Sequence, residues 1–110
     1  MQDNKNTIKK YPYRILLVDD EADISLTFSI VLEDNGFVVN AFNDPLLALS
    51  SFKQGLYALA LIDIKMPKMN GFDLYRQIRK LDDKVKVCFM TAFDIKKEEI
   101  KAALATLNEE

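Results

Sequence analysis

The stretch Arg14-Ile15-Leu16-Leu17-Val18-Asp19-Asp20-Glu21 places a short aliphatic run directly before a cluster of acids. A continuous apolar run of this length is typical of a strand that is buried on both faces, as in a parallel sheet. The third expected strand, Tyr57–Ile62, is followed in the same way by Asp63. The sequence therefore predicts buried strands that end in carboxylates.

Helical segments alternate with the expected strands. The segment Ala22–Asn35 has apolar residues at helical spacing, and Asn35-Gly36 supplies a left-handed stop. Asp44 followed by Pro45 predicts an N-cap and a first-turn proline, which open a helix to about Lys53. The residues expected to face the core in two of the helices are Ile24, Phe28, Val31, Leu32, Phe72, Tyr75 and Ile78. The remaining expected elements are strands at Phe37–Phe42 and Val85–Met90 and helices at Phe72–Leu81 and Ile95–Leu107.

The repeated strand-helix order predicts an α/β fold, a three-layer α/β/α sandwich in which helices cover both faces of a parallel sheet. A chain of 110 residues with 49% hydrophobic residues has enough apolar mass for a single core. Residues 1–12 are polar and are expected to form a flexible N-terminal arm. Residues 13–110 are expected to form the domain.

Composition excludes several kinds of chemistry. The chain has no histidine, which removes His metal ligands and His general bases, and its one cysteine cannot form an internal disulfide. A net charge of −2 gives no sign of a nucleic-acid interface. No apolar run approaches the ~20 residues of a membrane span. The polar N-terminus lacks a signal core, so we expect a cytoplasmic protein that binds neither nucleic acid nor membrane.

The strand ends predict a metal-dependent site. In open parallel sheets, ligands bind outside the carboxyl ends of the strands, where Asp19, Asp20, Asp63 and Thr91 are expected. Crowded oxygen ligands favour Mg²⁺, and a carboxylate beside Mg²⁺ can attack a phosphoryl group. Asp63 is the best nucleophile candidate because it stands alone, whereas the Thr91 hydroxyl and the Ala92 N–H can bind phosphoryl oxygens. Taken alone, the Asp19-Asp20 pair would equally fit a helix-capping loop.

Four motifs carry a resemblance to a known family. They are Ile15-Leu16-Leu17-Val18-Asp19-Asp20-Glu21, Leu61-Ile62-Asp63-Ile64-Lys65-Met66-Pro67, Asn70-Gly71-Phe72-Asp73 and Met90-Thr91-Ala92. In this order and at this spacing, the chain from about Tyr13 to Leu107 resembles the CheY-like receiver domain of two-component response regulators. The resemblance implies a flavodoxin-like strand order, 2-1-3-4 with a fifth strand outside the fourth.

The resemblance also implies the role of each site residue. Asp63 would accept a phosphoryl group from a phosphohistidine on a sensor histidine kinase or phosphotransfer protein. Asp20 and Asp63 would bind Mg²⁺ directly, together with the backbone carbonyl of Lys65, and Asp19 would hold a metal-bound water. Thr91 would be the switch hydroxyl.

Two further positions are expected to tune hydrolysis of the phosphorylated state. They lie two residues after the acceptor and two after the switch threonine, and here they are Lys65 and Phe93. Neither side chain offers a carboxylate or an amide to orient a water molecule, so we expect a long-lived phosphoprotein.

The family pattern continues beyond the end of this sequence. A fifth strand with a Lys-Pro pair and a fifth helix would follow, but the sequence ends at Asn108-Glu109-Glu110. We therefore expect a C-terminally incomplete receiver that is only weakly phosphorylated, because the lysine that pairs with the phosphoryl group is absent. The fourth strand, Lys84–Met90, would then be an exposed edge that could pair with a second copy to form a dimer.

Three functions are compatible with these residues. The first is a phosphoacceptor switch, which is not a turnover enzyme. The second is a degenerate receiver that acts only as a protein-binding module. The third is an aspartyl-phosphate phosphohydrolase, which is disfavoured because such enzymes carry an acid two residues after the nucleophile, where this chain has Lys65. For docking of the kinase we expect a stripe of Ala22, Leu26 and Ile30 on the first helix, although these residues could instead widen its core face.

Overall fold

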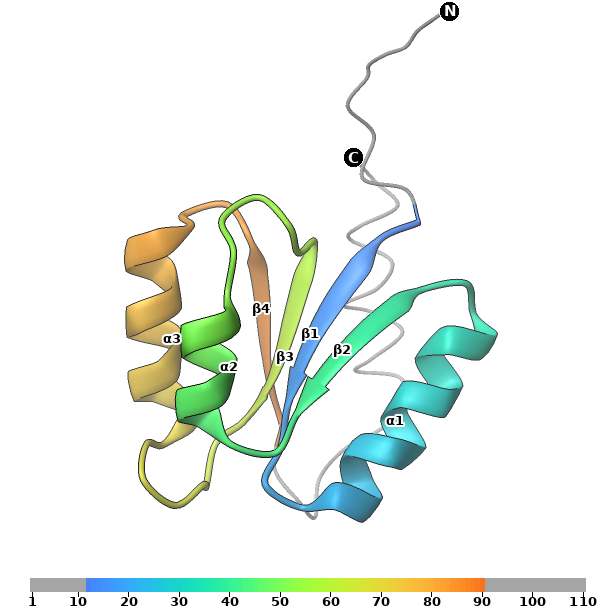
Figure 1. Cartoon of the computed structure of the whole chain (residues 1–110), viewed down its shortest axis with the longest axis horizontal. Helices are drawn as coiled ribbons and strands as arrows, with labels where there is room; N and C mark the ends of the chain where they lie inside the picture. The colour runs from blue at the N-terminus through green and yellow to red at the C-terminus, as the bar shows by residue number, and fades with distance from the viewer. Residues whose placement is uncertain (1–11, 91–110) are drawn as a thin grey trace, which may run out of the picture.

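A computed structural model describes residues 12–90, in which strands and helices alternate (Figure 1). The elements are β1 Arg14–Val18, α1 Ala22–Asp34, β2 Val38–Phe42, α2 Pro45–Ser51, β3 Leu59–Asp63, α3 Gly71–Leu81 and β4 Lys86–Met90. Every predicted element within this range is confirmed, with shifts of a few residues at the ends. The expected helix at Ile95–Leu107 lies outside the described residues. None of the helices within residues 12–90 has the length and the continuous hydrophobicity that crossing a membrane requires.

The described strands form a parallel sheet in the order β2-β1-β3-β4, which confirms the flavodoxin-like order. Val18 at the end of β1 pairs with Phe42 of β2 and Ile62 of β3, and Asp63 pairs with Met90 of β4. The carboxyl ends of all these strands therefore meet at one edge of the sheet, which is where the sequence predicts its site.

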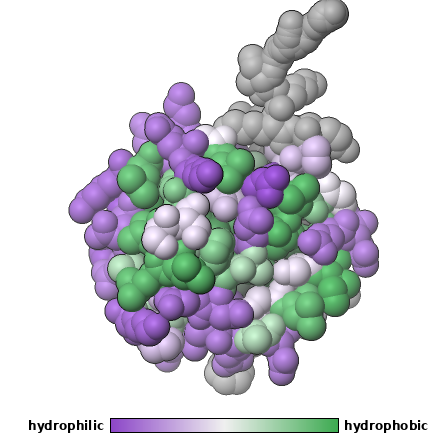
Figure 2. Space-filling model, viewed as in Figure 1, coloured by the Kyte–Doolittle hydropathy of each residue, from purple (hydrophilic) through white to green (hydrophobic). Residues whose placement is uncertain are grey.

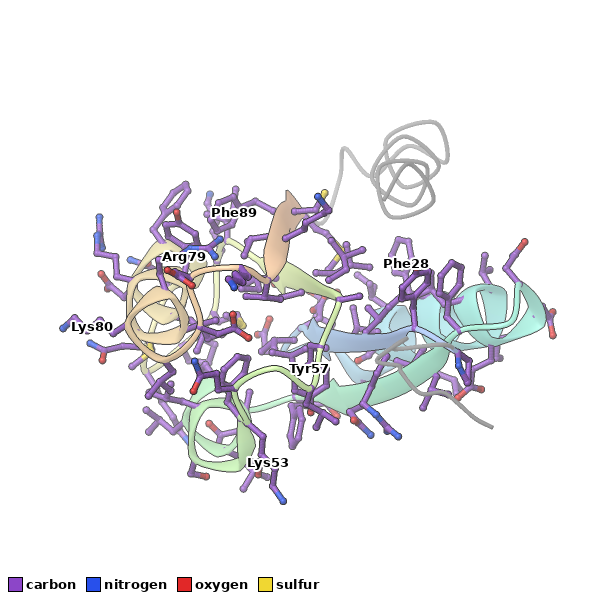
Figure 3. All side chains as sticks on the ribbon, turned by 90° about the horizontal axis from the view of Figure 1, so that it is seen from above. Phe28, Lys53, Tyr57, Arg79, Lys80 and Phe89 are labelled. Atoms are coloured by element: carbon purple, nitrogen blue, oxygen red, sulfur yellow. The ribbon has the colours of Figure 1, made fainter. Side chains whose placement is uncertain are left out.

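Alternate side chains of the central strands pack into two separate hydrophobic cores, one on each face of the sheet. Leu16 and Val18 belong to one core with Leu74 and Ile78 of α3. Ile15 and Leu17 face the other way, into a core completed by Leu32 of α1 and by Leu59, Leu61 and Met90. Figure 3 shows Phe28 on the α1 side of the sheet, with Tyr57 and Arg79 on the side of α2 and α3. The predicted three-layer α/β/α sandwich is therefore confirmed.

The predicted capping residues lie where they were expected. The Asp44 carboxylate accepts a hydrogen bond of 2.9 Å from the Leu46 N–H, and Pro45 is the first residue of α2. The side chain of Asn70, which the sequence analysis did not predict as a cap, accepts a bond of the same length from the Asp73 N–H and so caps α3. Gly36 follows α1 with φ 89°, the left-handed conformation that ends a helix.

The prediction that Val31 and Phe72 face the core is wrong. Val31 and Phe72 are 43% and 44% exposed, whereas Leu32 and Leu74 are fully buried. In α3 the reason is that Gly71 lies against the sheet backbone, which turns positions 71, 74 and 78 inward and Phe72 outward. Phe72 instead packs at the edge of the sheet, with its ring centroid 4.9 Å from that of Phe89.

Asp82 links two loops at the amino ends of the strands. This carboxylate is 5% exposed and accepts hydrogen bonds from the N–H groups of Gly55 at 2.9 Å, Lys84 at 2.9 Å and Val85 at 3.2 Å. Gly55 precedes β3, and Lys84 and Val85 precede β4. Asp82 therefore anchors neighbouring strands at the edge opposite to the acids.

The close approach of Gly71 generates a stability prediction. A Cβ atom on Gly71 would overlap the carbonyl oxygen of Asp63 and come within 3.0 Å of the Ile64 Cα. We expect Gly71→Ala to lower the free energy of unfolding by about 1–3 kcal/mol, because backbone atoms cannot make room without shifting β3 or α3. Urea denaturation measures this change.

The matched control for this variant is Gly36→Asn. A Cβ on Gly36 meets no atom within 4 Å, and asparagine tolerates the positive φ found there. We expect its cost to stay below ~1 kcal/mol. Wild-type stability of Gly71→Ala would contradict the proposed contact between α3 and β3.

Candidate functional site

Three carboxylates meet at the carboxyl edge of the sheet. Asp19 and Asp20 follow β1, Asp63 is the last residue of β3, and one oxygen from each lies within 4.8 Å of the others. Asp19 and Asp63 are 2% and 5% exposed, while Asp20 is open to solvent. The structure thus brings together the three acids that the sequence singled out.

Backbone hydrogen bonds hold the first of these acids in place. The Asp19 N–H donates to the Phe42 carbonyl at 3.1 Å and so continues the pairing of β1 with β2. The Asp19 carboxylate in turn accepts a hydrogen bond of 2.9 Å from the Glu21 N–H. This bond satisfies a donor at the start of α1 and fixes the carboxylate near Asp63.

The crowding changes the acidity of the buried acids. The pKa of Asp63 is raised from 3.8 to about 7, chiefly by burial and in addition by the charge of Asp19 and a hydrogen bond with Asp20. Burial also raises the pKa of Asp19, although its hydrogen bond from Glu21 works in the opposite direction. Like charges in a partly buried site repel, so the site favours protons or a cation.

The loop after Asp63 forms an open groove beside the acids. The Ile64 N–H donates to the Met90 carbonyl at 3.0 Å, and the Ile64 carbonyl accepts from the Gly71 N–H at 2.8 Å. These bonds join β3, β4 and the start of α3. The groove has a volume of about 540 Å³ and is lined by Ile64, Lys65, Met66, Pro67, Asn70 and Phe72.

The outcome differs among the other predicted site residues. The side chain of Lys65 is solvent-exposed, and the part that its carbonyl plays as a metal ligand stays a prediction. Thr91, Ala92 and Phe93 lie outside the described residues, so their roles also stay predictions. The docking stripe is on the surface, where Ala22 is exposed and Leu26 and Ile30 are 62% and 51% exposed.

Sequence reasoning missed two residues that touch the site. Nδ2 of Asn43, just after β2, donates to the Asp19 carbonyl at 2.8 Å and to Ser25 Oγ at 2.7 Å. The available signal was the position of Asn43, because the end of β2 meets the same edge as the ends of β1 and β3. Ser25 gave a weaker signal, a hydroxyl at a buried position of α1.

Comparison with known proteins agrees with this geometry. Residues 15–109 match the family described as the response regulator receiver domain. The chain belongs to this family. A curated relative, the transcriptional regulatory protein CpxR homolog of Haemophilus influenzae, is 39% identical over 79 residues, which are 72% of this chain and 34% of that protein. The receiver domain thus spans about a third of that relative.

A shorter relative is matched over more of its length. The response regulator receiver protein CpdR of Brucella abortus is 34% identical over 80 residues, which cover 73% of this chain and 67% of that protein. One relative is a transcriptional regulatory protein and the other a response regulator receiver protein by name, which agrees with a receiver domain in a two-component system.

Solved receiver structures share the fold. The response regulator TrrA from Thermotoga maritima, crystallised in complex with Mg²⁺-BeF, superposes with a TM-score of 0.75 at 26% identity. The match covers 86% of this receiver domain and 98% of that chain. A structure of histidine kinase ThkA in complex with TrrA gives a TM-score of 0.77 at 26% identity, covering 86% of this chain and 97% of that one.

The raised pKa of Asp63 predicts how stability depends on pH. The folded chain holds the Asp63 proton up to about pH 7, whereas the ordinary pKa is 3.8. This contribution to stability is full below pH 4 and is lost as the pH rises to about 7. At pH 8 without divalent metal, Asp63→Asn should raise the free energy of unfolding by on the order of 1 kcal/mol.

Urea denaturation at pH 4 and pH 8 in the presence of EDTA checks this dependence. The control is Asp34→Asn, which removes an exposed carboxylate at the end of α1 and should change either value by less than ~0.5 kcal/mol. An Asp63→Asn variant that is no more stable than wild type at pH 8 would show that the acids do not repel.

Proposed function

We propose that this receiver domain accepts a phosphoryl group on Asp63, with Mg²⁺ held by the acids around it. The observation that carries the proposal is the group of three carboxylate oxygens within 4.8 Å at the carboxyl ends of β1 and β3. Asp63 is buried at the end of the inner strand β3, and the loop that follows it lines an open groove.

The residues at this edge fit a magnesium ion. Hard carboxylate oxygens without His or Cys are the ligands that Mg²⁺ prefers, and repulsion among them is relieved by a divalent cation. We assign Asp20, Asp63 and the Lys65 carbonyl as direct ligands and Asp19 as the holder of a bound water. When bound, Mg²⁺ neutralises charge on the transferred phosphoryl oxygens.

Phosphoryl transfer then follows from the position of Asp63. A carboxylate oxygen of Asp63 attacks the phosphorus of a phosphohistidine, forming a P–O bond as the P–N bond breaks. The departing imidazole keeps the electron pair of that bond and takes up a proton. The attacking group must be ionised, and a cation beside the acids lowers the pKa of Asp63 from its raised value.

The remaining roles follow the family resemblance. Thr91 and Ala92 would bind the phosphoryl oxygens, and Lys65 and Phe93 would slow hydrolysis. The chain is thus a self-phosphorylating switch of a signalling system and not a turnover enzyme. Association of two copies through β4, an outer strand of the described sheet, is a further part of the proposal.

The partner that supplies the phosphoryl group would be a sensor histidine kinase or a phosphotransfer protein. Leu26 and Ile30 lie one helical turn apart on α1, and both are exposed to water. Adjacent exposed apolar side chains of this kind are typical of a surface that binds a partner. Figure 2 shows hydrophobic residues on the surface at the lower right, where Figure 1 places α1. Since α1 starts beside the acids, a helix docked on this stripe would hold its histidine near Asp63.

Labelling by a small phosphodonor tests the acceptor. Incubation of the chain with acetyl phosphate and Mg²⁺ should phosphorylate Asp63, as detected by intact-mass spectrometry and peptide mapping. Asp63→Asn should abolish the label, and EDTA should slow labelling by about a hundredfold or more, because the charge of the transferred group is no longer neutralised.

The exposed acid Asp73 provides the matched control, since Asp73→Asn on α3 should label normally. A label on another residue, or labelling that EDTA does not change, would overturn the acceptor assignment. Absence of any label on a chain that still binds a kinase would favour the binding-module alternative.

A charge on the docking stripe tests the partner surface. Leu26→Glu should slow phosphotransfer from a phosphorylated kinase by about tenfold or more, because a buried interface contact is replaced by a charge. The same variant should keep its rate with acetyl phosphate, which needs no docking. Radiolabel transfer assays measure both rates.

Leu47→Glu is the control because Leu47 is 54% exposed on α2, on the opposite face of the sheet. It should leave both rates unchanged. Equal losses of Leu26→Glu in the two assays would mean that Leu26 supports the fold instead of the partner.

A further inference from the structure

Asn43 lies in the loop between β2 and α2 but makes its contacts across the site. Its side-chain NH₂ group has two N–H donors, and both are used, one on the Asp19 carbonyl at 2.8 Å and one on Ser25 Oγ at 2.7 Å. It is not needed to cap the following helix, because Asp44 accepts the bond from the Leu46 N–H. The contacts of Asn43 are therefore directed to the loop that carries the acids.

These contacts belong to a closed circuit of hydrogen bonds. Ser25 Oγ accepts from Asn43 and donates to the Glu21 carbonyl at 3.1 Å. The Glu21 N–H donates to the Asp19 carboxylate at 2.9 Å, and the Asp19 carbonyl accepts from Asn43. The circuit thus returns to the residue at which it started, and it holds both the backbone and the side chain of Asp19.

The circuit opposes the repulsion inside the site. Burial, together with the charges of Asp20 and Glu21, raises the pKa of Asp19 and so disfavours its ionised carboxylate. Without a fixed Glu21 N–H, a short side chain such as Asp19 can turn to solvent, where it is better hydrated and farther from Asp63. Asn43 bonds the Asp19 carbonyl, and Ser25 bonds the Glu21 carbonyl. These two bonds hold the peptide groups on either side of the one that carries the Glu21 N–H.

We propose that Asn43 is a positioning residue, which holds Asp19 in the orientation that the magnesium site requires. The proposal rests on the proposed function of the site, since it assigns Asp19 a part in binding Mg²⁺. An aspartate could not replace Asn43, because it would bring another negative charge and no N–H donor.

Binding of Mg²⁺ alone to the full chain tests this role. Asn43→Ala should raise the Mg²⁺ dissociation constant, measured by isothermal titration calorimetry, by about tenfold. A loss of this size is usual when a residue that orients a metal ligand is removed. Asn40→Ala is the matched control, because Asn40 lies on β2, the strand that leads to Asn43, and its side chain accepts a hydrogen bond of 3.1 Å from Arg14 instead of contacting the acids. Equal affinities of Asn43→Ala and wild type would overturn the proposal.

Ser25→Ala tests the circuit itself. The double variant that carries both Asn43→Ala and Ser25→Ala should bind Mg²⁺ about as weakly as Asn43→Ala alone, because the two residues act through one chain of hydrogen bonds. Fully additive losses would show that Asn43 does not act through Ser25 and would overturn the circuit.

Hydrogen exchange of the Glu21 amide provides a readout that does not need the metal. In EDTA, Asn43→Ala should speed this exchange by about tenfold relative to amides of the central strands, whereas Asn40→Ala should not. A wild-type chain that binds no Mg²⁺ would overturn the proposed function, and the Glu21 exchange would then decide the positioning role. An unchanged exchange rate of the Glu21 amide in Asn43→Ala would overturn that role, whatever the measured Mg²⁺ affinities.

Discussion

Repulsion among three carboxylates at one edge of a parallel sheet is the constraint around which this structure is arranged. Pairing of Val18 with Ile62 aligns the ends of β1 and β3, so Asp19 and Asp63 meet whether or not their charges favour it. The two hydrophobic cores and the ladder hydrogen bonds supply the free energy that holds this arrangement. The result is a site with crowded negative charge, which protons or a cation would relieve, because the fold prevents its acids from separating.

The layered fold could be predicted from the sequence because its signals are local. Aliphatic runs such as Arg14–Val18 can be satisfied only by burial on both faces, and Asn35-Gly36 and Asp44-Pro45 fix helix ends through backbone chemistry. The meeting of Asp19 and Asp63 follows from topology, since parallel strands expose their carboxyl ends at one edge. The sequence alone therefore located the acids without any knowledge of side-chain geometry.

The parts that could not be predicted depend on contacts between distant segments. The inward face of α3 is set by the approach of Gly71 to the Asp63 backbone, so Phe72 turned outward although its spacing fitted the core. Asn43 and Ser25 are ordinary polar residues when considered singly. Their importance appears only when the ends of β1 and β2 are side by side, which brings an amide to the carbonyl of Asp19.

The anchor formed by Asp82 has a consequence for how the domain can deform. Its carboxylate ties the segments that enter β3 and β4, which opposes sliding or separation of these strands at their amino ends. We therefore expect a change of charge at the opposite edge to displace the carboxyl ends of β3 and β4 more than their amino ends. The loop after Asp63 should move farthest and the turn at Gly55 least. A change of charge at the acids would then be converted into a movement of the surface around Asp63.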